Sequence, residues 1–116
     1  MKLSTQSDAQ ILAVADPIMD NLMDASTAID YDRHTRDFTE RARRALPREA
    51  LRPICEQYQR DRGFFGPRVF VAIFRRADSV AIIWRQTFTK AAGDFVAEMV
   101  LVEEGGRCLV DHVMVF

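Results

Sequence analysis

Apolar residues alternate with polar or small residues along the second half of the chain, from Phe64 to Phe116. This period of two is typical of β-strands, because successive side chains point to opposite faces of a sheet. Tight turns are predicted at Ala77-Asp78, Ala92-Gly93 and Gly105-Gly106, where turn-forming residues interrupt the alternation. We therefore predict a four-stranded antiparallel meander made of the segments RVFVAIFRRA, SVAIIWRQTFTK, DFVAEMVLVEE and RCLVDHVMVF.

The N-terminal part of the chain has the period of a helix instead. Ser7 and Gln10 predict a capping box at the start of this helix. Because the apolar stripe keeps its phase across Pro17, we expect one bent helix; the alternative is a helix that starts at Pro17 with Asp16 as its N-cap. The stripe consists of Ile11, Ala15, Ile18, Leu22, Ala25 and Ile29.

Two more helices are expected before the sheet. Asp32 is a suitable cap for a largely charged helix from about residue 33 to residue 45. Pro47 stands where a third helix would begin, Pro53 is expected to kink or split that helix, and Gly63 is expected to end it. Helices followed by an antiparallel meander make the predicted fold class α+β, with about three helices packed on a curved four-stranded sheet.

The composition fits one globular domain over residues 1–116, with 48% hydrophobic and 28% charged residues. The net charge of -1 gives no general attraction to nucleic acid or to an anionic membrane, so we expect neither as a partner. Positive charge is concentrated in residues 33–62, and we interpret it as a solvated helix surface. The alternative is a surface for an acidic protein or a phosphate, formed by Arg41, Arg43, Arg44, Arg48 and Arg52.

Cys55 and Cys108 are isolated in the sequence, and neither lies at a metal-ligand spacing. Two buried free thiols are therefore expected, together with a reducing compartment. The first ten residues lack the apolar core of a secretory signal, and no window has the length of a membrane span. We expect a cytoplasmic protein with no metal and no cofactor.

Strict alternation sorts the strand side chains into two faces. One face is almost wholly apolar and is expected to lie under the helices. The other also carries too many apolar residues for a face in contact with water, which favours a dimer interface. Arg85, Glu98 and Asp111 are expected to form an ionic cluster on this second face. The predicted interface consists of Phe70, Phe74, Ile83, Arg85, Glu98, Val100, Asp111 and Val113.

The segment AIDYDRHTRDF, after the first helix, resembles the "gDY…F" segment of small bacterial members of the nuclear transport factor 2-like (NTF2-like) superfamily. The segments VAIIWRQTFTK and GDFVAEMVLVEEGGR resemble hairpins of the same superfamily. The resemblance covers nearly the whole chain, which lacks the short hairpin that many members place before the third helix. It implies a cystatin-like cone, dimers formed through the sheet, and a pocket between sheet and helices. Some members are enzymes and many are not.

The leading hypothesis is a small non-catalytic domain that forms homodimers and holds an apolar ligand. The alternative is an enzyme of isomerase, hydrolase or dehydratase type that acts on a small hydrophobic substrate, with His112 as acid or base beside Asp30. His34 is expected to be solvated, because it belongs to the charged helix. The predicted pocket consists of Tyr31, Tyr58, Trp84, Gln86, Met99 and His112.

Overall fold

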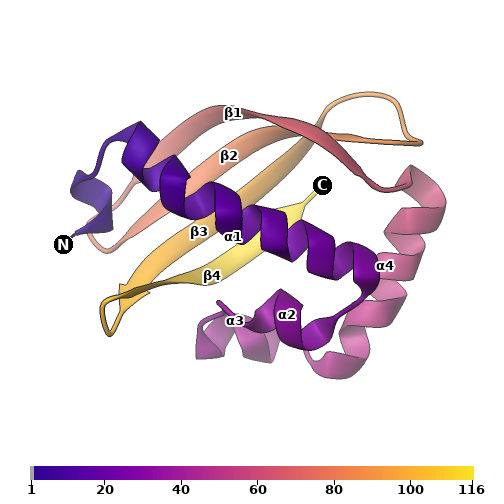
Figure 1. Cartoon of the computed structure of the whole chain (residues 1–116), viewed down its shortest axis with the longest axis horizontal. Helices are drawn as coiled ribbons and strands as arrows, with labels where there is room; N and C mark the ends of the chain where they lie inside the picture. Colours follow the sequence, from indigo (N-terminus) through magenta and orange to yellow (C-terminus); the bar gives the residue numbers. More distant parts are fainter. Residues whose placement is uncertain (1) are drawn as a thin grey trace.

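The computed structural model describes residues 2–116, in which a group of helices precedes one four-stranded antiparallel sheet (Figure 1). The strands neighbour one another in chain order and form a curved sheet, and α1 crosses one of its faces. The predicted α+β fold class is thus confirmed. The elements are η1 (Leu3–Thr5), α1 (Asp8–Ala28), α2 (Tyr31–Thr35), α3 (Glu40–Ala45), α4 (Arg48–Arg62), β1 (Phe65–Arg75), β2 (Ser79–Phe88), β3 (Phe95–Glu104) and β4 (Arg107–Val115).

Helix α1 is continuous and contains Pro17, as the unbroken phase of its apolar stripe predicts. The capping box is present, since the Ser7 side chain accepts from the Gln10 backbone and the Gln10 side chain accepts from the Ser7 backbone. The helix ends at Ile29, which has a left-handed backbone conformation with φ of 55°. Helix α4 likewise continues through Pro53 without splitting, and it ends at Gly63 as expected.

The predicted second helix is two short helices, α2 and α3. The residues between them are held in an extended conformation by β4, because Thr39 N donates to Val110 O (2.9 Å) and Val110 N donates to Asp37 O (2.7 Å). The expected cap is also two residues too late, since the side chain of Asp30, rather than that of Asp32, accepts from Arg33 N. Pairing with a strand distant in the sequence therefore overrides the local helical pattern.

Three shifts in strand pairing decide which side chains face the helices. One extra residue is inserted in β1 between Phe65 and Arg68, a second at Val71 in β1, and a third at Asp111 in β4. A β-bulge of this kind moves the residues on one side of it to the opposite face. The predicted faces are therefore wrong for the first part of β1 and the last part of β4. Phe70 lies opposite Trp84 and faces inward, whereas His112 lies opposite Val100 and faces outward.

The predicted ionic cluster is wrong for the same reason. Arg85 is paired with Asp94 (3.5 Å) rather than with Asp111, and the Glu98 carboxylate lies 2.9 Å from His112 Nε2. Three residues of the predicted interface also leave the outer face: Phe70 and Val113 pack against the core, and Asp111 is bonded to residues of the α3 region. The others, Phe74, Ile83, Arg85, Glu98 and Val100, lie on the outer face.

The core lies between α1 and the inner face of the sheet. Its sheet side is formed by completely or almost completely buried residues of the central strands, and its helix side by the stripe of α1. Cys55 and Cys108 are both free thiols, as predicted, but only Cys55 is buried, whereas Cys108 is partly exposed. Among the described residues, no helix combines the length and the apolar character needed to cross a bilayer. The innermost residues are Ile11, Ala15, Met19, Val80, Ile82, Trp84, Ala97, Met99, Leu101 and Val110.

Candidate functional site

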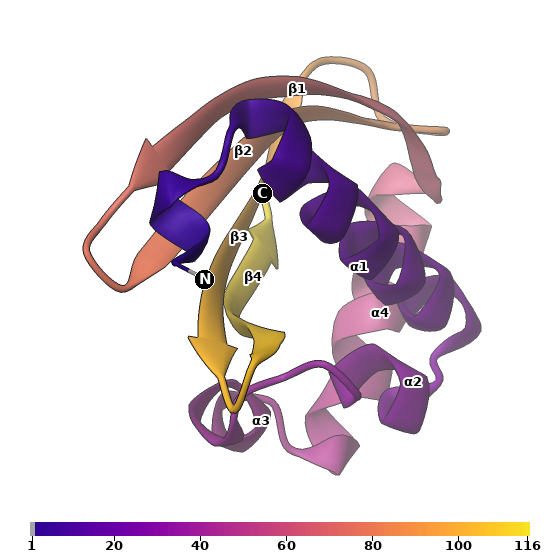
Figure 2. The same cartoon turned by 60° about the vertical axis from the view of Figure 1, so that its left-hand side comes forward.

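A cavity of about 420 Å³ lies between the second half of α1, the three shorter helices and the last residues of β4. Figure 2 shows α1, α2 and α4 across from β4, which is one of the two edge strands, and α3 beside the hairpin between β3 and β4. Ile54 lines the cavity and its side chain is about half exposed, so the cavity reaches the surface there. The apolar part of the wall consists of Met19, Leu22, Met23, Phe38, Ala42, Ala45, Leu46, Leu51, Ile54, Phe65, Val113, Met114 and Val115.

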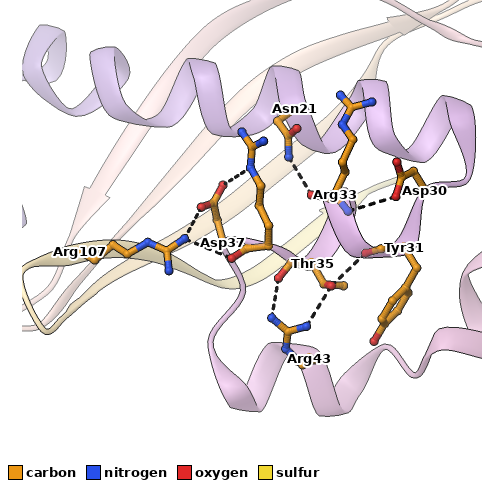
Figure 3. A network of polar contacts seen from close by, with 9 residues as sticks. Asn21, Asp30, Tyr31, Arg33, Thr35, Asp37, Arg43 and Arg107 are labelled. Atoms are coloured by element: carbon orange, nitrogen blue, oxygen red, sulfur yellow. Dashed lines mark hydrogen bonds and ion pairs between the residues drawn. The ribbon is translucent and has the colours of Figure 1, made fainter.

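Helix α2 contributes His34 to this wall and is held in place by polar contacts with its neighbours (Figure 3). Asn21 of α1 donates to Arg33 O (2.9 Å), so its buried amide joins the two helices. Arg43 of α3 donates to the Thr35 carbonyl (3.0 Å) and hydroxyl (3.2 Å). Because α2 has only five residues, it depends on its neighbours for its position, and these bonds hold the backbone on both sides of His34.

The segment after α2 is tied to the sheet in the same way. Arg107 of β4 donates to Asp37 Oδ1 (2.7 Å) and to Arg36 O (3.2 Å), and the Arg36 side chain lies on the other oxygen of Asp37 (3.4 Å). Together with the backbone pairing of Asp37 and Thr39 to Val110, these contacts join α2, α3 and β4 into one wall (Figure 3).

The His34 imidazole is largely buried, and its Nδ1 atom has no hydrogen-bond partner among residues 2–116. Its ring meets the edge of Phe38 with a centroid distance of 5.5 Å. Burial lowers the pKa of His34 from its ordinary value of 6.5 to about 4, because the charged form loses its hydration. At neutral pH the ring is therefore uncharged, with one N–H donor and one acceptor nitrogen.

The opposite wall carries a second polar group between α1 and α4. Ser26 Oγ lies 2.8 Å from the Tyr58 hydroxyl and 3.3 Å from Cys55 Sγ, so these three side chains satisfy one another. Burial raises the pKa of the Cys55 thiol, which keeps the sulfur protonated and unreactive as a nucleophile at neutral pH.

Asp111 provides the carboxylate on the cavity wall, and its oxygens are occupied. Thr39 Oγ1 donates to Oδ1 (2.8 Å), Arg41 Nε donates to the same oxygen (3.2 Å), and the Arg41 guanidinium also bonds Oδ2. The Arg41 hydrogen bond lowers the pKa of Asp111, although burial opposes this shift. The group is an anchor between α3 and β4 and stays ionised.

The structure brings together only part of the predicted pocket. Tyr58 and His112 are among the lining residues. Trp84, Gln86 and Met99 lie on the inner face as fully buried core residues and do not line the cavity.

Tyr31 and Asp30 line a separate surface pocket, where the Tyr31 hydroxyl donates to Leu46 O (2.7 Å). The predicted pair of His112 with Asp30 is wrong, since the His112 ring is bonded to Glu98 on the outer face and Asp30 caps α2.

His34 is the principal wall residue that sequence reasoning missed, because it was expected to be solvated. A signal for its burial was present in the sequence. His34 precedes Phe38 by four residues, and Phe38 precedes Ala42 by four, so the predicted continuous helix would have placed all three on one face. Ser26 and Cys55 gave no comparable signal, because their contact joins two helices that lie far apart in the sequence.

The arginines proposed as a phosphate surface have partners inside the chain. Arg41 is bonded to Asp111, Arg44 to Glu40 (3.4 Å), Arg48 to Asp32 (2.6 Å) and Arg52 to Glu56 (3.8 Å). Arg43 is used in the contact with Thr35. In the part of the chain that the structure describes, no cluster of three or more His, Cys, Asp and Glu side chains is arranged to hold a metal ion.

The chain matches no family model and no curated protein sequence. Several solved structures resemble the chain, including two at low identity. The Bdellovibrio bacteriovorus protein Bd1075 aligns with a TM-score of 0.53 and 8% identity, over 94% of this chain and 42% of that chain. A Sinorhizobium meliloti protein with a provisional assignment as a polyketide cyclase aligns with a TM-score of 0.50 and 10% identity, over 86% of this chain and 94% of that chain. The chain thus spans less than half of the Bdellovibrio protein, and both similarities establish a shared α+β fold.

Proposed function

We propose that this chain is a small-molecule-binding domain of the NTF2-like type, which holds an apolar ligand in the cavity between the helices and β4. The observation that carries the proposal is the cavity of about 420 Å³ with a mainly apolar wall. Binding pockets for small molecules have volumes in this range and combine apolar walls with a few polar groups. The fold shared with the protein assigned as a polyketide cyclase supports the same class of function.

The polar groups of the wall favour an uncharged ligand. Ser26, Tyr58 and Cys55 are bonded to one another, and the charge of Asp111 is balanced by Arg41. His34 is neutral at physiological pH. A charged ligand would lose its hydration in the cavity without gaining a free partner of opposite charge. We expect binding without chemical turnover, since the carboxylate of the wall is already used as a structural anchor.

Binding of naphthalene, followed by its own fluorescence, tests the proposal. The variant Ala42→Leu adds side-chain volume to the cavity wall, and Ala13→Leu makes the same change at an exposed position of α1 outside the cavity. We expect saturable binding to the wild type and to Ala13→Leu, and binding at least about tenfold weaker to Ala42→Leu, because a filled pocket excludes the ligand. The proposal is wrong if the wild type shows no saturable binding, or if a folded Ala42→Leu binds as well as the wild type.

We also propose that a second copy of the chain covers the outer face of the sheet. Apolar side chains on this face are half exposed or more, namely Val69, Val71, Phe74, Met114 and Phe116. A single chain rarely leaves so many apolar groups of one sheet face in water. Light scattering coupled to size-exclusion chromatography tests this part, and a strict monomer at high concentration would contradict it.

A further inference from the structure

Five consecutive residues of β4, from Asp111 to Val115, line the cavity. We propose that this stretch of strand edge recognises the ligand through its backbone, and that the ligand is an extended, uncharged peptide segment with apolar side chains, which pairs with β4 as an additional strand. This inference rests on the proposed function, and it names the chemical class of the ligand and the groups that select it.

The unbroken run of five residues is the first argument. Side chains alternate between the two faces of a strand, so a space over one face of β4 would meet only every second residue. The His112 side chain lies on the outer face, where it is bonded to Glu98, and Met114 belongs to the same face. Both residues nevertheless border the cavity, and none of the five is buried. The cavity therefore meets the edge of β4, where the backbone lies.

The hydrogen-bond pattern shows which backbone groups point to this edge. Val96 N donates to Phe116 O (2.6 Å) and Phe116 N donates to Val96 O (2.9 Å). In an antiparallel ladder, such pairs alternate with pairs that exchange no hydrogen bonds. The register continues without a shift as far as His112, so the N–H and C=O groups of Val113 and Val115 point away from β3. In the described part of the chain, no segment pairs with these two donors and two acceptors.

Val110 shows that the same edge accepts an extended segment. Its N–H donates to Asp37 O (2.7 Å) and its C=O accepts from Thr39 N (2.9 Å), in a parallel arrangement. After Thr39 the chain turns into α3 and leaves the edge. The pairing thus stops just before the residues that line the cavity, and a ligand segment would continue it.

The two edge strands of the sheet differ in how they are protected. Proteins usually guard open strand edges with prolines, charges or bulges, because such edges pair with other chains. Strand β1 contains Pro67, Arg75 and two register shifts. The last residues of the sheet, VMVF at 113–116, contain neither a proline nor a charge. Helices stand across from this edge (Figure 2), so a cavity of about 420 Å³ admits one extended segment but not the sheet of a second folded copy.

A short peptide segment matches this edge and the cavity together. When a peptide is added to a sheet edge, its main chain supplies hydrogen bonds and its alternate side chains occupy apolar pockets. Val113 and Val115 are about 7 Å apart along the strand, so three residues are enough to pair with both. The segment is uncharged, because the Asp111 carboxylate is already paired with Arg41.

A capped tripeptide of valine, leucine and valine, with an acetyl and a methylamide end, is the probe. Two ester analogues replace the N–H of its second or of its third residue by oxygen. Since N–H groups alternate in direction along an extended chain, we expect one ester to bind about threefold to tenfold more weakly than the amide and the other to bind like it. Ala42→Leu, which fills the cavity, should bind the tripeptide at least about tenfold more weakly. Isothermal titration calorimetry measures all of these affinities.

Hydrogen exchange followed by NMR gives a readout on the wild type. We expect the amides of Val113 and Val115 to exchange faster than that of Met114 in the free protein, because only Met114 N–H is used in the ladder with β3. Saturating tripeptide should slow the exchange of Val113 and Val115 at least about tenfold relative to that of Met114.

A matched pair of variants removes one donor of the edge. Val115→Pro lacks the free N–H and leaves the ladder with β3 intact, since proline is tolerated where an edge strand does not use its N–H. Val115→Ala shortens the side chain and keeps the N–H. We expect Val115→Pro to bind the tripeptide about threefold to tenfold more weakly than Val115→Ala.

The failures of the two proposals are distinguishable. If neither naphthalene nor the tripeptide binds the wild type, the proposed function is wrong. If naphthalene binds and the tripeptide does not, or if both esters bind as tightly as the amide, the binding cavity stands and the role of the β4 edge is wrong. Unchanged exchange of Val113 and Val115 in the presence of bound tripeptide would overturn the edge pairing in the same way.

Discussion

The two halves of the space between helices and sheet are built differently. Beside the first half of α1, the side chains of Val80, Ile82 and Leu101 are completely buried, and the core is filled. Beside the second half of α1, where α2, α3 and α4 face the end of β4, a cavity of about 420 Å³ remains. The same helix and the same sheet thus border both a close-packed core and an open space.

The difference lies in what holds each half together. In the filled half, β2 and β3 pair without a register shift and meet one long helix, so apolar side chains interdigitate. In the cavity half, the wall consists of short helices joined by extended residues, and its shape depends on polar contacts such as Asn21 to Arg33 and Asp111 to Thr39. Packing of apolar side chains stabilises the filled half, whereas hydrogen bonds define the shape of the cavity half.

The largest difference between the two halves is expected from matched Leu→Ala substitutions, which should lower the free energy of unfolding by different amounts. Leu101 belongs to the filled core, and Leu51 lines the cavity, although both are at least 97% buried. We expect Leu101→Ala to lower the free energy of unfolding by about 3–5 kcal/mol, because it creates a new void in close-packed surroundings. Leu51→Ala should cost about 1–3 kcal/mol, since its side chain already borders empty space. Denaturant unfolding measures both, and equal losses would contradict the comparison.

The free energy of unfolding should depend on pH because His34, in the cavity half, binds a proton less readily in the folded chain than in the unfolded chain. Its pKa is about 4 in the folded chain and near 6.5 in the unfolded chain, so the unfolded state binds the proton first as the pH falls. The contribution of neutral His34 to the free energy of unfolding is fully present above pH 6.5. It is lost between pH 6.5 and about pH 4, to a total of about 3 kcal/mol.

The variant His34→Asn removes this titration and provides the test. Its stability should change less than that of the wild type between pH 6.5 and pH 4. Denaturant midpoints at several pH values measure the slope. Parallel curves for the two proteins would show that His34 is not buried in a neutral form.

The filled half was predictable from sequence and the cavity half largely was not. The alternation in β2 and β3 and the stripe of α1 placed Ile82, Met99 and Ile11 correctly, because regular elements keep a fixed period. The cavity half depends on interruptions of that period. The extra residue at Asp111 reverses the faces of His112 and Val113. The local sequence does not indicate this bulge, which lies beside the backbone pairing of Val110 with Asp37 and Thr39.

The residues of the candidate site were the hardest to predict from the sequence. Its wall comes from four helices, the start of β1 and the end of β4, so its residues meet only in the folded chain. Tyr58 was identified as a pocket residue because it lies on the inner face of a periodic helix. His34 was assigned to solvent because its neighbours are charged, although its spacing from Phe38 favoured burial.

A smaller effect is expected from the anchor between α3 and β4. Asp111→Asn removes the charged partner of Arg41, and we expect a loss of about 1 kcal/mol at pH 7, because Arg41 itself is well exposed and screened. Since the pKa of Asp111 is held below 3.8, its contribution is present above that pH and is lost as the pH falls further. The variant should therefore lose less stability below pH 3.8 than the wild type. Asp94→Asn is the matched control with almost no expected effect, because its pair with Arg85 is exposed on both sides.

The smallest effect on the stability of one chain is expected on the outer face, where Phe74 is 57% exposed. Phe74→Ser should change the free energy of unfolding of the monomer by about 0.5 kcal/mol or less, because little packing is lost. If a second copy covers this face, the same change should raise the dimer dissociation constant at least about tenfold. Ile54→Ser is the matched control, since Ile54 is 54% exposed on α4, away from the sheet face, and its loss should leave association unchanged. Sedimentation equilibrium of both variants distinguishes the cases: an equal response, or none, would mean that the exposed apolar residues of the sheet are not the contact between copies.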